Sequence, residues 1–91
     1  MPTTLEPGQE RWLSCQLDRG MFSDEVAVTY PPVGAAVRSV FVPNTAVRGT
    51  LGRPGRVLVR VFRQAGNIFA VLPTPQSETV AVAESDLSDS P

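Results

Sequence analysis

The chain has 91 residues, of which 42% are hydrophobic and 19% are charged, and its formal net charge is −1. This length and balance predict one globular domain and argue against disorder over the whole chain. The apolar runs are only a few residues long and the first residues lack basic and apolar regions, so we expect neither an apolar membrane-spanning helix nor a secretory signal.

The frequent prolines and glycines along the chain favour short strands over helices. Nine prolines and seven glycines leave few windows that hold three helical turns. Valine is by far the commonest large apolar residue, and β-branched side chains favour strands. We therefore expect no long helix.

The first predicted elements form a hairpin. Residues 1–9 contain two prolines and a glycine and are expected to be a flexible arm. Alternation of apolar and polar residues predicts a strand over 11–18 and another over 25–30. A turn signal at 18–20 lies between them, so the two strands are expected to pair.

Further alternating segments follow as far as the acidic end of the chain. Pro43 ends the third of the predicted strands, because a proline cannot donate to a central ladder. A long glycine-rich connection over 44–55 separates it from the clearest strand of all. Leu87 is expected to return to the core, and residues 88–91 are expected to be a frayed acidic tail. The four further predicted strands are 36–42, 56–63, 67–72 and 78–83.

Five to six short strands without a crossover helix predict an all-β fold, either a sandwich or a barrel. A small SH3-like, partly open barrel is the first expectation, with residues 10–87 as its single domain. An OB-like barrel is the second, because that fold usually includes a helix that the sequence does not show.

The residue inventory argues against an enzyme. Histidine and lysine are missing, and the one cysteine, Cys15, has no histidine to activate it. Cys15 shares a predicted strand face with Leu13 and Leu17, so we expect a buried structural thiol that forms no disulfide, which fits a reducing, cytoplasmic setting. Asp24 and Glu25 are adjacent acids at a turn, a position typical of solvated residues. We expect no catalytic residue, no metal site and no cofactor.

Charge is distributed unevenly along the chain. Residues 1–25 carry a net charge of −3, residues 26–77 carry +6 without a single acid, and residues 78–91 carry −4. In one interpretation the central arginines pair with Glu78, Glu84 and Asp86. In the other they face an anion such as nucleic acid, with four candidate residues: Arg48, Arg53, Arg56 and Arg60.

Three apolar side chains are expected on the outer face of the sheet. If the valines of the strand 56–63 fill the barrel, Leu58 and Phe62 point outward, and Trp12 does the same on the first strand. Apolar patches on small domains mark interfaces. The sequence therefore predicts a non-enzymatic binding or assembly module whose partner is another protein or a second copy, with nucleic acid as the alternative, an enzyme as a distant third, and no membrane partner.

Overall fold

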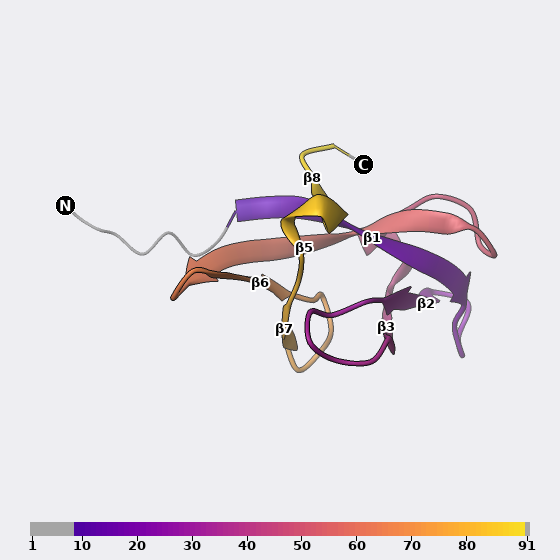
Figure 1. Ribbon diagram of the computed structural model, residues 1–91. Helices are drawn as coiled ribbons and strands as arrows, with labels where there is room; N and C mark the ends of the chain where they lie inside the picture. The colour runs from indigo at the N-terminus through magenta and orange to yellow at the C-terminus, as the bar shows by residue number, and fades with distance from the viewer. Residues whose placement is uncertain (1–8, 91) are drawn as a thin grey trace.

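The computed structural model describes residues 9–90, and these residues form an all-β fold without α-helices. The expectations for residues 1–8 and for Pro91 lie outside the described part. The strand bounds are β1 Gln9–Arg19, β2 Glu25–Tyr30, β3 Arg38–Pro43, β4 Val47–Arg48, β5 Pro54–Gln64, β6 Asn67–Val71, β7 Thr79–Ala81 and β8 Leu87–Ser88, and Figure 1 labels each of them except β4. Two short 3₁₀ turns, η1 (Asn44–Ala46) and η2 (Glu84–Asp86), lie between strands.

Two long strands form the centre of the sheet. β1 and β5 pair antiparallel from Gln9 opposite Val61 to Gln16 opposite Pro54. The main path through the sheet is β3-β2-β1-β5-β6-β7, while β4 adds to β5 and β8 adds to β1. Figure 1 shows β2 and β3 below one end of this pair and β6 and β7 below the other, so that the sheet curls into a half-barrel. The all-β expectation is confirmed, and this shape is consistent with the small SH3-like barrel.

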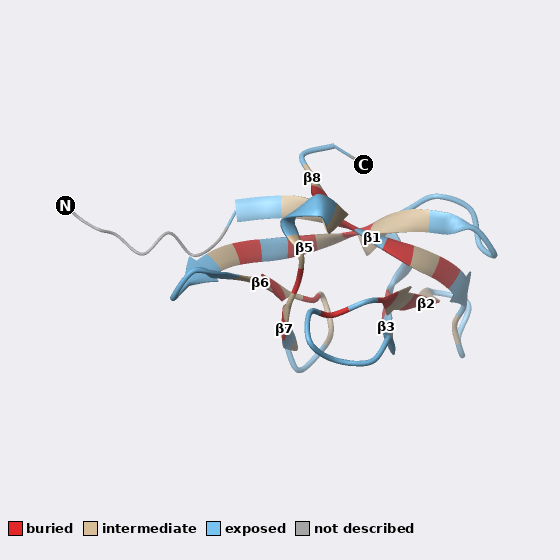
Figure 2. Cartoon of the chain, viewed as in Figure 1, coloured by how far each residue is buried: buried red, intermediate tan, exposed pale blue. Residues whose placement is uncertain are grey.

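The core lies on the inner face of the curl. Buried and exposed residues alternate along β1 and β5, as the colour bands in Figure 2 show. Side chains in a strand point to opposite faces in turn, so one apolar set from each strand meets inside. The largest fully buried side chains are Tyr30, Leu13, Leu17, Leu72, Val28, Val42, Val57 and Val59.

The two ends of the sheet path meet through few contacts. The Val33 amide, after β2, donates to the Ala81 carbonyl of β7 at 2.9 Å. Arg38 of β3 and Glu78, next to β7, form an ion pair with Nη2 and Oε2 2.6 Å apart. β3 and β7 do not share a ladder within the described residues, so the half-barrel keeps an open seam.

The differences from the expected elements occur at short strands. β4 lies inside the segment predicted as a connection, where Val47 pairs with Val57, and two residues are too few to show an alternating pattern. Leu87 is buried, as expected, but it belongs to a strand that was not predicted, β8, where it pairs with Leu13. In the segment expected to be a frayed tail, Ser88 pairs with Trp12 and the Asp89 carboxylate lies 2.8 Å from Arg11 Nε.

Candidate functional site

The three apolar residues expected on the outer face are half-buried. Trp12 and Leu58 are directly opposite each other on β1 and β5. Phe62 stacks on Phe69 of β6, with ring centroids 5.5 Å apart and an interplanar angle of 23°. The Phe69 ring thus covers part of Phe62, and the large apolar side chains that are most exposed lie elsewhere.

The exposed large apolar residues are concentrated around the β1–β2 turn and β3. They are Met21, Phe22, Val33, Val37, Phe41 and Leu51. Phe22 and Phe41 were not among the residues that the sequence predicted at an interface. A signal existed for Phe41, because alternation with a buried Val42 places it on the outer face; Phe22 lies in a turn, where no periodicity assigns a face.

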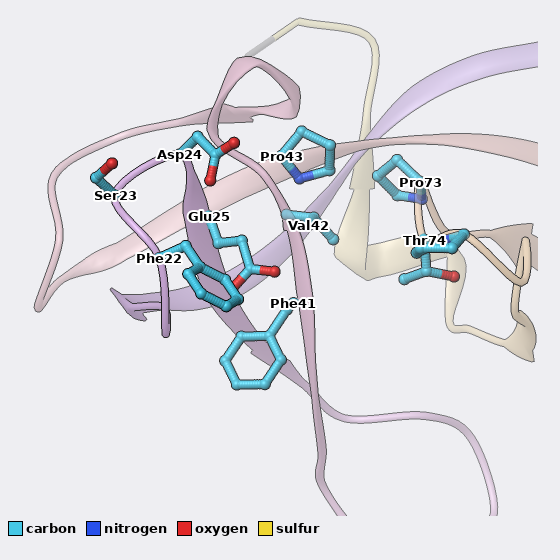
Figure 3. Close-up of a pocket in the computed structure, with 10 residues that line it drawn as sticks. Phe22, Ser23, Asp24, Glu25, Phe41, Val42, Pro43, Pro73 and Thr74 are labelled. Atoms are coloured by element: carbon cyan, nitrogen blue, oxygen red, sulfur yellow. The ribbon is translucent and has the colours of Figure 1, made fainter.

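Phe22 and Phe41 line a groove at the open seam. One wall consists of residues 22–25 and 41–43, and the other consists of residues 73–75, which follow β6. Figure 3 shows the Glu25 side chain on the same side of the ribbon as the two phenylalanine rings, with Pro73 and Thr74 across the gap. The groove thus combines aromatic rings, prolines and two carboxylates, those of Asp24 and Glu25.

Local backbone geometry positions Glu25 in this groove. A Cβ on Gly20 would lie 2.7 Å from the Glu25 Cβ, so the β1–β2 turn approaches Glu25 more closely than any other residue type allows. The Glu25 amide donates to the Phe22 carbonyl at 3.1 Å, and the Asn44 amide donates to the Asp24 carbonyl at 2.9 Å. Glu25 Oε1 is buried and has no hydrogen-bond partner among residues 9–90, so its acceptor capacity is unused within the described chain.

The central arginines divide into paired and unpaired sets. Arg38 forms an ion pair with Glu78, and Arg63 lies 3.4 Å from Glu84. The third expected acid, Asp86, forms no ion pair within the described residues. Within the described residues, no carboxylate lies within ion-pair distance of the four anion-site candidates, Arg48, Arg53, Arg56 and Arg60.

The structure brings two of these four arginines together. Arg48 and Arg56 are directly opposite each other on β4 and β5, and the Arg48 guanidinium lies 5.2 Å from the centroid of the Trp12 ring. Arg56 Nη1 donates to the Ser90 carbonyl at 2.9 Å. Arg60 is farther along β5, opposite Glu10, and Arg53 lies in the turn that joins β4 to β5.

Cys15 lies in the core, as the sequence predicted. Burial raises the pKa of its thiol to about 11, so the nucleophilic thiolate is scarce at neutral pH. Residues 9–90 contain no cluster of three or more side chains suited to holding a metal ion. Over the same residues, no helix has the length and apolar character needed to cross a membrane.

Comparison of the chain with protein-family models, with curated proteins and with solved structures gave no significant match.

Proposed function

We propose that the protein is a non-enzymatic binding module that takes an extended segment of a partner protein into the seam groove, with a basic side chain of that segment at Glu25. The observation that carries this proposal is the buried, unpartnered Glu25 oxygen in a groove lined by two exposed phenylalanines. A reducing, cytoplasmic location for the module is part of the proposal.

Apolar contact would come from the rings. Phe22 is 66% exposed and Phe41 is 44% exposed, so both rings contact water in the free protein. Aromatic residues are enriched in protein interfaces because one rigid ring buries a large area at small entropic cost. Burial of these rings under a partner segment is therefore favourable.

Charge determines which segment fits. Asp24 and Glu25 lie in the groove wall, and no arginine is among the residues that line it. A guanidinium or ammonium group placed there would face the carboxylates of Asp24 and Glu25 and lie near the aromatic rings, an arrangement that adds cation–π attraction. An acidic segment would meet like charges instead.

The unpaired edge of β3 explains why the segment would be extended. β3 pairs with β2 alone within the described residues, and its far edge borders the groove. Backbone groups on such an edge are ready to pair with an added strand, and side-chain pockets then supply specificity.

Selection from a library of displayed random peptides tests this proposal. We expect enriched peptides to carry arginine or lysine next to an apolar residue, and to shift the NMR signals of the β3 amides on binding. Phe22→Ala and Glu25→Gln should each weaken binding about tenfold, as hot-spot truncations do.

Leu51→Ala provides the matched control, because Leu51 is an exposed apolar residue outside the groove. It should leave peptide affinity unchanged. Selected peptides without a basic residue, or peptide binding that Glu25→Gln does not weaken, would contradict the proposal.

A further inference from the structure

We infer that the outer face of β1, β4 and β5 is a second binding site, distinct from the seam groove, and that it takes single-stranded nucleic acid. The basic face is defined by Arg48 and Arg56 on β4 and β5 together with Trp12, and Arg53 lies in the turn that joins these two strands. Arg48 and Arg56 carry like charges, and no carboxylate among the described residues forms an ion pair with either of them.

Arg48 and Arg56 are directly opposite each other across β4 and β5. Like charges in that position repel each other and destabilise a sheet. The carboxylates that form ion pairs in residues 9–90 are those of Asp89, Glu78 and Glu84, and they bind other arginines. A bound anion would remove this repulsion.

A phosphate is the anion that best fits two adjacent guanidiniums. Each guanidinium presents a planar set of donors that matches phosphate oxygens two at a time. In the free protein one nitrogen of each guanidinium donates to a main-chain carbonyl: Arg48 to that of Val47 at 2.8 Å and Arg56 to that of Ser90. A phosphate carries a full charge and would compete with both carbonyls.

Trp12 distinguishes nucleic acid from other polyanions. Its indole ring is half-buried between the sheet and the Arg48 guanidinium, which makes an indole–guanidinium platform. Bases stack on aromatic rings and on guanidinium planes, and they are free to do so only where they are not already paired and stacked in a duplex. Phosphate contacts and stacking at one place therefore indicate a single strand.

Arg60 is expected to contribute less than the other three. It is directly opposite Glu10 on β1, and that carboxylate offsets part of its charge. Arg63 is already paired with Glu84 on an exposed part of the molecule. Arg63→Gln therefore removes one positive charge from the chain without touching the basic face.

Titration with oligo(dT) at low salt tests the inference, with Trp12 fluorescence as the readout, since Trp12 is the one tryptophan of the chain. Three phosphate contacts predict a slope of log affinity against log salt of about −2. In the double variant Arg48→Gln/Arg56→Gln one contact remains, so the slope should become less steep, about −0.7. Arg63→Gln should keep the original slope. Thermal melts establish that each variant is folded.

Two further ligands decide the class of partner. A duplex of the same length and inorganic polyphosphate should both bind more weakly than oligo(dT) and leave Trp12 fluorescence unchanged. Equal affinity for polyphosphate or for the duplex would overturn the assignment to single strands. Absence of oligo(dT) binding at low salt would show that the basic face is not a nucleic-acid site. Peptide binding at the seam groove is a separate measurement, so neither result bears on the proposed function.

Discussion

Cys15 illustrates how burial controls the chemistry of a single side chain. The pKa of its thiol rises from the ordinary value of 9.0 to about 11, because the thiolate would have to exist in the apolar core. Since the thiolate is the reactive form, we expect labelling of the native protein by a disulfide reagent at neutral pH to be far slower than labelling in urea. Labelling at the rate of a free thiol would contradict the burial of Cys15.

The same pKa shift makes stability depend on pH. In the unfolded chain the thiol ionises from about pH 9, whereas in the folded protein it keeps its proton up to about pH 11. The unfolded state therefore binds fewer protons in this window, and the free energy of unfolding falls as the pH rises from 9 to 11. Urea titrations at pH 8 and pH 10 measure the decline, which should be smaller in Cys15→Ala.

Gly55 occupies a position that excludes a side chain. A Cβ there would lie 2.6 Å from the Arg48 carbonyl oxygen, which β4 pairing holds in place, and would also clash with Leu17. We expect Gly55→Ala to cost about 3 kcal/mol, since backbone and core must both shift. Gly52→Ala is the comparison: its φ of +84° strains the backbone but its surroundings are open, so the cost should be about 1 kcal/mol. Urea denaturation gives both values, and equal costs would contradict the argument.

At the scale of elements, alternation located the strands of three or more residues and missed the two-residue strands. β2 occupies the predicted residues 25–30, because its alternating pattern extends over the full strand. β4 and β8 have two residues each, and only long-range pairing with β5 and β1 defines them. The sequence named Arg48, Arg53, Arg56 and Arg60 as anion candidates, but it did not show which arginines form ion pairs. The partners of Arg38 and Arg63 are Glu78 and Glu84, which lie far along the chain. The groove was missed because its walls meet only in the folded sheet.

Leu87 makes β8 part of the core. It is 9% exposed and packs with the buried side chains of the central strands. Leu87→Ala should lower the free energy of unfolding by about 2–4 kcal/mol through lost burial and a residual cavity. Val37→Ala, at an exposed position, should stay within about 0.5 kcal/mol. An equally small effect of Leu87→Ala in urea denaturation would mean that β8 is dispensable.

At the scale of the whole molecule, the ion pair across the seam contributes little to stability. The Arg38 side chain is 52% exposed, so solvent screens its attraction to Glu78. A double-mutant cycle with Arg38→Ala and Glu78→Ala should give a coupling of about 0.5–1 kcal/mol. The more exposed Arg63–Glu84 pair should give about zero. A coupling well above 2 kcal/mol would contradict this expectation and would mean that the Arg38–Glu78 ion pair holds the two sides of the seam together.

The central place of β1 has a consequence during synthesis on the ribosome. β1 is made early, yet its main partner β5 extends to Gln64 and β8 lies at residues 87–88. When only the first three strands have emerged, the apolar side of β1 has no opposite wall, and folding must wait for contacts that span 38 to 52 residues. Such distant pairing is slow, and it leaves an unpaired strand edge open to other nascent chains. We therefore expect truncated chains that stop before residue 54 to aggregate, and the native sheet to form only after β5 has emerged from the ribosome.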